Sequence, residues 1–294
     1  MTENKTFSIK EDGFFGILFK SEKEICPNKA LLLCTGSDGN IDSLKNFSQR
    51  FCDSGITVLG IGFYKVPDGS DTICEIPLEY AEKAGNYLKS IGYEKIAFYS
   101  ISMGSVYALL SGSYFPELFG LVVVSAPLNY VYQAVSPDKR RLIDEKSAFS
   151  YKGKPIPYEP NVNKMSMRNF IIDSFKKGDV SNAYLYESLV TTAKEEHLIP
   201  VEKMKAHIIL FTGKMDYYWP SYASAEMIMK RLKEHNYTYP YEHISFEHGG
   251  HLLAPVEITG LLTKFFKATR KYPEENEQYR KEILEKIIES FKTF

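Results

Sequence analysis

Three residues whose side chains can act together in nucleophilic catalysis occur in order along the chain: Ser102, Asp216 and His251. A serine hydroxyl is a weak nucleophile at neutral pH and needs a neighbouring base to remove its proton. A histidine imidazole can be that base and can later return the proton to the leaving group. A carboxylate orients the imidazole and stabilises its charged form. These residue types predict serine-dependent acyl transfer, provided that the fold brings them together.

The sequence around the serine favours a nucleophile. Ser102 stands in the segment Phe-Tyr-Ser-Ile-Ser-Met-Gly-Ser, between an apolar run that predicts a strand and a helical pattern. In the motif G-x-S-x-G the serine occupies a sharp strand-to-helix turn, and small flanking residues let the two elements pass closely. Here Ser100 replaces the first glycine, and its small side chain is compatible with the turn. A plain helix N-cap is the alternative role for Ser102. Ser100 is a poorer candidate nucleophile, because Met103-Gly104 places the tight turn after Ser102.

The carboxylate and the base each follow an apolar run that predicts a strand. Asp216 closes the segment Gly-Lys-Met-Asp after the run 207–212, and His251 closes His-Gly-Gly-His after the run 241–247. Serine, then acid, then histidine, each after a strand, is the order of the α/β-hydrolase fold. A turn or capping role is the alternative for Asp216. His248 competes with His251, but the glycine pair favours His251 because it carries that residue off the strand end. The other histidines lie within or beside predicted elements, where we expect structural roles: His197, His207, His235 and His243.

Backbone amides for an oxyanion hole are predicted at two places. One is the N–H of Met103, directly after the serine. The other lies in the loop Thr-Gly-Ser-Asp-Gly at residues 35–39, where either Gly36 or Ser37 would donate. An ordinary turn between a strand and a helix is the alternative for this loop. A phosphate-binding loop is not indicated, because no Gly-Lys-Ser/Thr sequence follows.

The elements that must position these residues alternate between strands and helices. The expected strands are 14–19 (at a sheet edge), 30–34, 56–63, 95–99, 121–125, 207–212 and 241–247. The expected helices are 40–52, 77–90, 103–113, 222–234, 256–271 and a charged surface helix over 274–294. This alternation indicates an α/β protein with the α/β-hydrolase fold: a mostly parallel central sheet, helices on both faces and a lid insertion.

The 294 residues are expected to form a single α/β-hydrolase domain, 1–294, with two added features. Residues 127–200 interrupt the alternation and are rich in Tyr, Lys and Pro, with helical patterns only over 169–175 and 182–192. An insertion at the end of the sheet where active sites form is commonly a lid or cap over the substrate. Residues 274–294 form the C-terminal helix.

Composition narrows the class of protein. A formal net charge of −1 with 25% charged residues makes no global electrostatic case for a nucleic acid or an anionic membrane as partner. No apolar stretch approaches the roughly 18 residues of a membrane span, and the polar segment 1–10 lacks the apolar core of a signal peptide. The four cysteines show no metal-binding spacing, and Cys34 lies in an apolar run that predicts a buried thiol. We therefore expect a reduced, cytoplasmic protein.

Further sequence blocks carry a resemblance to a known family. They are Ile-Ser-Met-Gly at 101–104, the Tyr/Pro-rich segment 151–158, Ile-Pro-Val-Glu-Lys-Met at 199–204, Gly-Lys-Met-Asp at 213–216, Trp-Pro-Ser at 219–221 and Gly-Gly-His-Leu at 249–252. In these blocks the chain resembles the catalytic C-terminal domain of the acyl-CoA thioesterase and bile acid-CoA:amino acid N-acyltransferase family, within the dienelactone-hydrolase-like α/β hydrolases. The similarity spans roughly residues 31–265, and Ser100 departs from the family's first elbow glycine. The resemblance implies the same triad, Ser102, Asp216 and His251. In this family thioesterases carry serine and the amino-acid acyltransferase carries cysteine, so serine implies hydrolysis.

The expected function is therefore hydrolysis of acyl thioesters (acyl-CoA-like) or carboxylic esters through an acyl-enzyme. Acyl transfer to an amino acid or another amine is the alternative, and a general carboxylesterase or a peptidase is a further one. No cofactor and no metal are expected, because the chain itself supplies the nucleophile, the base and the oxyanion donors. The expected partner is a small-molecule acyl ester or acyl-CoA, with a homodimer left open.

Side chains of the insertion and of one later loop are the candidates for substrate contact. The candidate substrate-binding aromatic residues are Tyr130, Tyr151, Tyr158 and Trp219. The three tyrosines, which belong to the insertion, are expected to line an acyl pocket or to pack the lid down. Basic residues of the insertion, among them Lys139, Arg140 and Arg141, could meet a CoA phosphate, with a solvated surface as the alternative.

Overall fold

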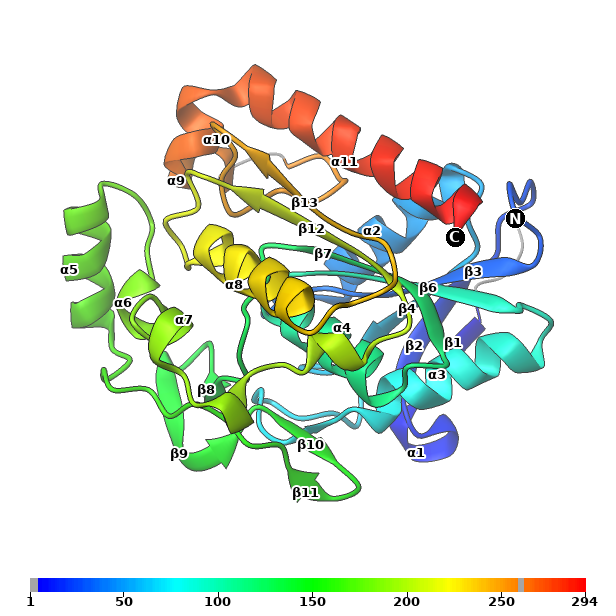
Figure 1. Cartoon of the computed structure of the whole chain (residues 1–294), viewed down its shortest axis with the longest axis horizontal. Helices are drawn as coiled ribbons and strands as arrows, with labels where there is room; N and C mark the ends of the chain where they lie inside the picture. The colour runs from blue at the N-terminus through cyan, green and yellow to red at the C-terminus, as the bar shows by residue number, and fades with distance from the viewer. Residues whose placement is uncertain (1–4, 259–261) are drawn as a thin grey trace.

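A single eight-stranded sheet organises the computed structural model, which describes residues 5–258 and 262–294 (Figure 1). The strand order is β1-β2-β4-β3-β6-β7-β12-β13. Strand β2 (Phe15–Phe19) is antiparallel to both of its neighbours, β1 (Lys5–Phe7) and β4 (Val58–Gly62). From β4 onward all neighbouring strands are parallel: β3 (Lys29–Cys34), β6 (Lys95–Ile101), β7 (Phe119–Ser125), β12 (His207–Gly213) and β13 (Tyr241–Phe246). The predicted mostly parallel sheet is confirmed.

The register of the central strands brings several chain segments to one edge of the sheet. Cys34 pairs with Ser100, and Ile101 pairs with Ser125. Strand β12 lies beside β7 with Phe211 opposite Ser125. Because parallel strands all end at the same side, the loops that follow β3, β6, β7, β12 and β13 meet there. This edge is where the candidate site forms.

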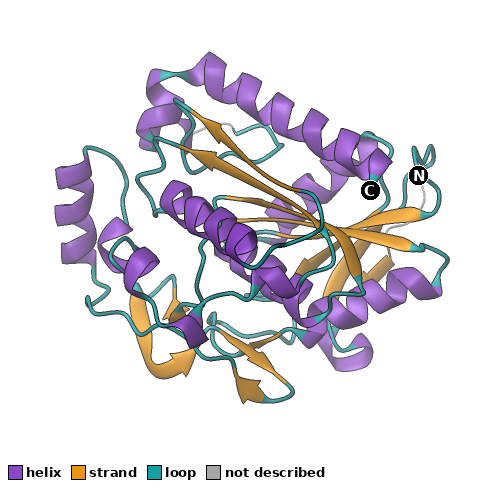
Figure 2. Cartoon of the chain, in the orientation of Figure 1, coloured by secondary structure: helices purple, strands orange, loops and turns teal. Residues whose placement is uncertain are grey.

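Helices cover both faces of the sheet (Figure 2). On one face α2 (Ile41–Asp53) and α11 (Pro273–Thr293) bury Phe51 and Phe291 against strand residues such as Tyr99. On the other face lie α3 (Glu79–Ser90), α4 (Met103–Tyr114) and α8 (Ser221–Glu234). Helix α4 is buried over nearly its whole length, as a helix between the sheet and a covering layer should be.

Two expectations about the ends of the sheet and the chain are corrected. The strand predicted at 14–19 does not form the edge, because the short strand β1 pairs beyond it. The polar stretch 1–10 shows no alternating pattern, so this strand escaped prediction. Helix α11 was expected to be a surface helix, yet Ile283, Ile287 and Phe291 are buried in the core. The many charged residues of this helix made its buried apolar side hard to recognise in the sequence.

The helix expected over 256–271 is also corrected. The structure has two short helices in its place, α9 (Leu262–Phe265) and α10 (Lys267–Lys271), with extended backbone at Phe266 between them. Residues 256–258 are not helical, and 259–261 lie outside the described residues. The aromatic ring of Phe266 lies beside His251, with ring centroids 6.4 Å apart. The break in the helix therefore lies at the candidate site.

The segment between β7 and β12 contains the insertion. Its first half holds β8 (Gln133–Ser136), β9 (Arg141–Ser147), β10 (Phe149–Tyr151) and β11 (Lys154–Pro155), none of which the sequence predicted. Strand β10 pairs in parallel with β5 (Ile76–Pro77), just before α3. This half is therefore attached to the main body. Its second half holds α5 (Met167–Lys177), α6 (Ala183–Tyr186), α7 (Leu189–Thr192) and the 3₁₀ turns Glu195–His197 and Val201–Lys203.

Three further observations concern the described residues. None of their helices combines the length and the apolar character that crossing a bilayer requires. They contain no group of three His, Cys, Asp or Glu side chains arranged to hold a metal ion. The four cysteines are free thiols, and burial raises the pKa of the Cys34 thiol to about 12. The prediction of a buried thiol at Cys34 is thereby confirmed.

Candidate active site

Ser102 occupies a strained turn between β6 and α4. Its backbone has φ 58° and ψ −132°, a region that costs a non-glycine residue about 1–3 kcal/mol. The N–H of Ser102 donates to the carbonyl of Ser125 over 3.0 Å, which ties the turn to the end of β7. A Cβ added at Gly104 would overlap the carbonyl oxygen of Thr35 and Oγ of Ser100, so only glycine fits there. The predicted strand-to-helix elbow is present.

The departure from the elbow motif at Ser100 has a local explanation. Ser100 is fully buried, and its Oγ donates to the carbonyl oxygen of Cys34 on β3 over 2.9 Å. The hydroxyl is thereby satisfied between two paired strands, where an unbonded polar group would be costly. Its direction, toward β3, leaves Ser102 as the serine that faces the edge of the sheet.

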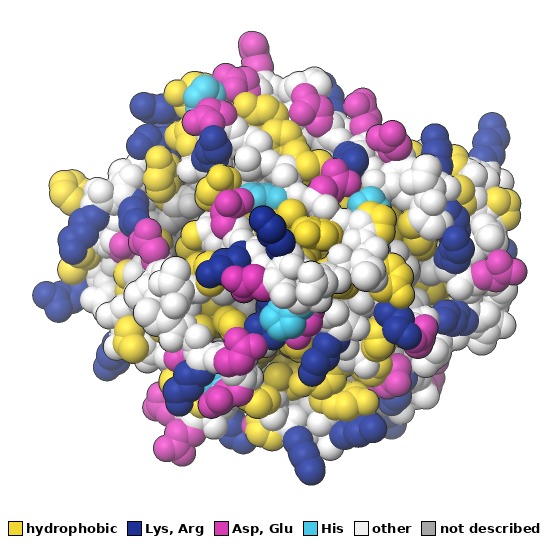
Figure 3. Space-filling model, viewed as in Figure 1, with side chains coloured by type: hydrophobic (Ala, Val, Ile, Leu, Met, Phe, Trp, Pro, Cys, Tyr) yellow, Lys and Arg dark blue, Asp and Glu magenta, His cyan; other side chains and the backbone are white. Residues whose placement is uncertain are grey.

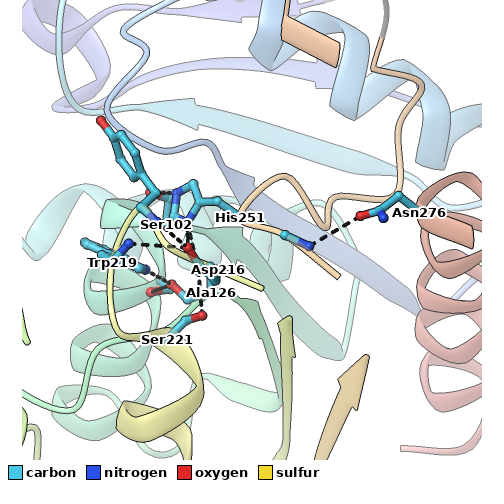
Figure 4. A network of polar contacts seen from close by, with 10 residues as sticks. Ser102, Ala126, Asp216, Trp219, Ser221, His251 and Asn276 are labelled. Carbon is cyan, nitrogen blue, oxygen red and sulfur yellow. Dashed lines mark hydrogen bonds and ion pairs between the residues drawn. The ribbon is translucent and has the colours of Figure 1, made fainter. Parts of the chain in front are cut away.

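A chain of hydrogen bonds links Ser102, His251 and Asp216 (Figure 4). Oγ of Ser102 lies 2.9 Å from Nε2 of His251, and Nδ1 of His251 lies 3.0 Å from Oδ2 of Asp216. The side chains of His251 and Asp216 are only 5% and 1% exposed. An Nδ1–H donated to the carboxylate leaves Nε2 with a lone pair directed at the serine hydroxyl. The arrangement can accept the proton of Ser102.

Asp216 is held by more than its histidine partner. Its Oδ1 accepts hydrogen bonds from the N–H groups of Tyr218, at 3.1 Å, and Trp219, at 3.3 Å. Its Oδ2 accepts from the hydroxyl of Ser221 over 2.6 Å. Asp216 therefore both caps the turn, which was the alternative role considered for it, and contacts His251. The two hydrogen bonds from the turn fix the plane of its carboxylate.

The loop that carries His251 depends on close backbone contacts. A Cβ added at Gly213 would overlap the backbone of Gly249, so the end of β12 and this loop touch without side chains. The amide of Met215 donates to the carbonyl of Gly249 over 2.9 Å. From α11, Oδ1 of Asn276 accepts from the N–H of Gly250 over 3.3 Å (Figure 4).

Asn276 is a positioning residue that sequence reasoning missed. Its side chain is 1% exposed, and its Nδ2 donates to the carbonyls of His248 and Tyr272, both at 2.9 Å. It therefore holds both sides of the glycine turn that precedes His251. Asn276 lies within a charged helical pattern, where nothing distinguishes it from its solvated neighbours.

The competing histidine points elsewhere. Nδ1 of His248 lies 2.8 Å from Glu275, and its ring stacks on Tyr272 with centroids 3.8 Å apart. The remaining histidines also have partners outside the site: His197 with Glu159, His207 with Glu242, His235 with the carbonyl of Arg231, and His243 with Glu226. Among the six histidines, His251 is the one bonded to Ser102.

The loop after β3 lies directly against the serine. A Cβ added at Gly36 would be 3.1 Å from Cβ of Ser102 and 3.6 Å from its Oγ. Met103 is the first residue of α4, so its N–H has no partner within the helix. Both backbone segments expected to supply oxyanion donors thus adjoin Ser102. The contact at Gly36 places the backbone of that residue beside the nucleophile.

Aromatic rings surround His251. The ring centroids of Tyr218 and Trp219 lie 4.7 Å and 5.7 Å from that of His251. Trp219 is only 1% exposed, and its Nε1–H donates to the carbonyl of Ala126 over 3.1 Å (Figure 4). Trp219, expected to contact substrate, is thus a buried support for the histidine. Tyr218 and Phe266, which the sequence reasoning did not select, are the half-buried rings at this place.

Arg140 approaches this aromatic cluster from the insertion. Its guanidinium donates to Oδ1 of Asn182 over 2.8 Å and lies 3.9 Å from the ring centre of Phe170. Burial raises the pKa of Tyr218, and the nearby charge of Arg140 opposes that rise. Within the described part of the chain, Nε of Arg140 is buried without a hydrogen-bond partner and no carboxylate pairs with the guanidinium. Arg140 is thus a cation without a counterion among the described residues.

The three tyrosines expected to line an acyl pocket have partners within the protein. Tyr130 is fully buried, and its hydroxyl donates to the carbonyl of Tyr186 over 3.2 Å. Tyr151 packs on Tyr114 and Phe115, at the opposite end of α4 from Ser102, about 16 Å along the helix. Tyr158 is half-buried, with the nearby charges of Glu145 and Asp144 acting on it. These contacts favour packing of the insertion, the other role considered for them.

Comparisons with known proteins show which proteins this chain is similar to. Residues 76–259 match the model of the family described as "BAAT / Acyl-CoA thioester hydrolase C terminal". The chain is 26% identical over 204 residues to "Acyl-coenzyme A thioesterase 2, mitochondrial" of Mus musculus, which covers 68% of this chain and 40% of that protein. It is 23% identical over 228 residues to "Acyl-coenzyme A amino acid N-acyltransferase 1" of Mus musculus, which covers 74% of this chain and 47% of that protein. The chain thus spans less than half the length of these relatives.

A solved structure supports the fold assignment. A Klebsiella pneumoniae protein assigned as a dienelactone hydrolase superposes with a TM-score of 0.57 at 10% identity, covering 99% of each chain. A likeness at this identity concerns the fold alone. Together with the sheet order and the covering helices, it confirms the predicted α/β-hydrolase fold.

Proposed function

The chain belongs to the BAAT and acyl-CoA thioester hydrolase C-terminal family, and from this premise we propose that it hydrolyses acyl thioesters or carboxylic esters. The observation that carries the proposal is the hydrogen-bonded series Ser102–His251–Asp216. Its nucleophile stands on a strained elbow, and its base is buried beside an immobilised carboxylate. Such an arrangement activates a hydroxyl that would otherwise be a weak nucleophile.

In the acylation step, Nε2 of His251 removes the proton of Ser102 as Oγ attacks the carbonyl carbon of the substrate. The carbonyl oxygen becomes an oxyanion, which accepts hydrogen bonds from the N–H of Met103 and from the loop at Gly36. Asp216 stabilises the imidazolium that forms. When the tetrahedral intermediate collapses, the leaving thiol or alcohol takes the proton from His251, and Ser102 carries the acyl group as an ester.

In the second step, water attacks the acyl-enzyme while His251 again acts as the base. The carboxylic acid leaves, and the proton returns to Oγ of Ser102. Every proton transfer uses the same imidazole. The hydrogen bond from His251 to Asp216, and the hold of Asn276 on the glycine turn before His251, therefore matter in both steps.

An anionic leaving group is favoured by one feature of the site. Arg140 has a buried Nε without a partner in the described residues. It is linked through Asn182 to Tyr218, whose ring lies beside His251. A phosphate or carboxylate of the substrate would supply the missing acceptor through charge-assisted hydrogen bonds. Because the similar mouse proteins are named for acyl-coenzyme A, whose coenzyme is phosphorylated, we propose an acyl-CoA or a comparable anionic thioester as substrate.

Acyl transfer to an amine is the second candidate, because a mouse relative is named as an amino acid N-acyltransferase. It would use the same acyl-enzyme and replace water by an amine in the second step. In the family that the chain resembles, thioesterases carry serine and the amino-acid acyltransferase carries cysteine. The serine nucleophile therefore favours water over an amine as the acyl acceptor.

Two experiments test the proposal. A fluorophosphonate probe should label the wild-type protein and the Ser100→Ala variant, and should leave Ser102→Ala unlabelled. Equal labelling of Ser102→Ala would remove Ser102 from the mechanism. A panel of acyl-CoAs of different chain length beside p-nitrophenyl esters then identifies the leaving group. Ester turnover with every acyl-CoA inert would contradict the thioester proposal, and amide product on addition of glycine or taurine would establish transfer.

A further inference from the structure

Helix α5 of the insertion presents its apolar side to solvent. Phe175 is 88% exposed, Ile171 60% and Met167 55%, and their spacing of four residues places them along one side of the helix. Val162, just before the helix, is 75% exposed, and Ile172 is 40% exposed. In a helix that packs on its own domain the apolar side faces inward. Here that relationship is reversed.

A polar side anchors α5 to the rest of the insertion. Asp173 is the buried residue of this helix, and its Oδ2 accepts from the hydroxyl of Ser181 over 2.5 Å and from the N–H of Tyr184 over 3.2 Å. The apolar side chains therefore stay outward while the helix itself is held by hydrogen bonds.

Basic side chains are numerous in the segment that carries this apolar surface and in α9 and α10, which follow the site loop. The segment after α5 is joined to α10, because the N–H of Lys267 donates to Oδ1 of Asp179 over 2.9 Å. Phe265, at the end of α9, is 51% exposed. The basic residues of these segments are Lys164, Arg168, Lys176, Lys177, Lys264, Lys267, Arg270 and Lys271. Asp173 and Asp179 are buried, and Glu187 is paired with Lys177. Figure 3 shows hydrophobic and basic side chains gathered at the left edge of the molecule, where Figure 1 places α5.

We propose that this surface, the α5 patch (Val162, Met167, Ile171, Ile172, Phe175 and Phe265 with the basic residues of these segments), docks on a lipid surface that carries anionic headgroups. Exposed apolar side chains can enter the boundary between headgroups and acyl chains, while Lys and Arg are attracted to anionic lipids. Large exposed apolar side chains grouped along one side of a helix in this way mark an interaction site. The net charge of −1 concealed this local concentration of positive charge.

The positive charge of the α5 patch favours a lipid surface over a second copy of the chain as its binding partner. A two-fold dimer through the α5 patch would place the same residues opposite each other. The basic side chains of one copy would then face those of the other, and like charges in such an interface are destabilising. An anionic lipid surface complements both the apolar and the basic component.

The α5 patch is connected to the candidate site. The guanidinium of Arg140 lies over the ring of Phe170 on α5, 3.9 Å from its centre. Arg140 also bonds Asn182, whose N–H donates to the carbonyl of Tyr218 over 2.9 Å, and the ring of Tyr218 lies beside His251. Docking would place the insertion, and with it the site, next to a phase that holds long acyl chains. The docking itself does not require the proposed chemistry, so it can be measured with the Ser102→Ala chain.

Flotation with lipid vesicles tests the docking. The 294-residue chain with Ser102→Ala should float with vesicles of phosphatidylcholine containing about 30 mol% phosphatidylserine. It should bind more weakly to phosphatidylcholine alone, and less as salt is raised. Ile171→Glu with Phe175→Glu changes only exposed positions and should reduce the bound fraction about tenfold or more. The matched control is Ile91→Glu, a 45% exposed position after α3, which should bind as the parent does.

A second variant separates the charge from the apolar contribution. Arg168→Glu with Lys176→Glu should remove the preference for phosphatidylserine while the thermal midpoint stays unchanged, because both side chains are exposed. Absence of flotation of the parent at low salt would overturn the proposal. Equal flotation of the Ile171/Phe175 variant would do the same, and so would a parent dimer that becomes monomeric on that substitution without any vesicle binding.

Discussion

The hydroxyl of Ser221 donates a hydrogen bond to Oδ2 of Asp216 over 2.6 Å, and the same oxygen faces Nδ1 of His251 at 3.0 Å. Ser221 is the first residue of α8 and is fully buried. The carboxylate that orients the histidine is therefore itself oriented from the start of a helix. This hydroxyl couples helix α8 to the site.

Ser221→Ala is expected to lower kcat about tenfold with little change in KM, because a hydrogen bond to a charged group is worth about 1.5–3 kcal/mol. The rate of fluorophosphonate labelling should fall in parallel. Ser224→Ala is the matched control, since Ser224 is equally buried on α8 but its Oγ has no hydrogen-bond partner in the described residues. Equal kinetics for the two variants would show that the bond to Asp216 does not matter.

Asn276→Ala should lower the free energy of unfolding by about 2 kcal/mol and slow the labelling of Ser102, because it removes the clamp on both sides of the Gly249–Gly250 turn. Urea unfolding and labelling kinetics measure the two effects. Gln278→Ala, an exposed position on the same helix, is the control. A stability loss with unchanged labelling would confine Asn276 to a purely structural role.

Ser100→Ala should lower the free energy of unfolding by about 1 kcal/mol and leave labelling at Ser102 intact, because the bond from its hydroxyl to the Cys34 carbonyl is internal to the sheet. Thermal unfolding and probe labelling are the measurements. Ser100→Gly, which restores the family's elbow glycine, should also keep labelling. Loss of labelling in both variants would return Ser100 to consideration as the nucleophile.

Arg140→Gln should raise the KM for acyl-CoA about tenfold while turnover of a neutral p-nitrophenyl ester stays the same, because only the anionic substrate loses a charge-assisted bond. Steady-state kinetics on both substrates check this. Arg141→Gln, at the exposed neighbouring position, should match wild type on both. A parallel rise in KM for the neutral ester would indicate that the insertion, rather than the charge, has changed.

Acid should weaken the fold partly through His243 on β13. Burial lowers the pKa of His243 below its ordinary value of 6.5, although Glu226 at 2.9 Å opposes this. At a pH between the lowered pKa in the folded protein and the ordinary pKa in the unfolded chain, His243 binds a proton only in the unfolded chain. The free energy of unfolding therefore falls as pH drops below about 6.5. Urea unfolding between about pH 7.5 and 5.5 should show a shallower decline for His243→Gln than for wild type.

The elements around the site were largely predictable, because their signals are local. Continuous apolar runs identified β3, β6, β7 and β12, and each segment was confirmed within a few residues. The elbow at Ser102 requires small residues at fixed offsets, and the serine–acid–histidine order depends only on position along the chain. These features can be identified without knowing which distant segments meet.

The side chains that support the site were not predictable in the same way. Asn276 looks like a surface residue in its own segment, and Arg140, a candidate for a CoA phosphate, could not be told apart from Lys139 and Arg141 beside it. Both matter because other segments lie against them. The tyrosines at 130, 151 and 158 suggested a pocket by composition, yet neighbours elsewhere in the fold surround them with packing contacts.

By itself, the sequence determined the type of sheet, the elbow and the identity of three side chains that meet at its edge. The tertiary structure alone decided how those side chains are held, which side of α5 faces solvent, and that the segment after α5 is joined to the basic helix α10. The spacing of apolar residues along the sequence shows that they lie on one side of a helix or strand. Whether that side faces the core or solvent depends on contacts with other segments, such as Asp173 with Ser181 or Asp179 with Lys267.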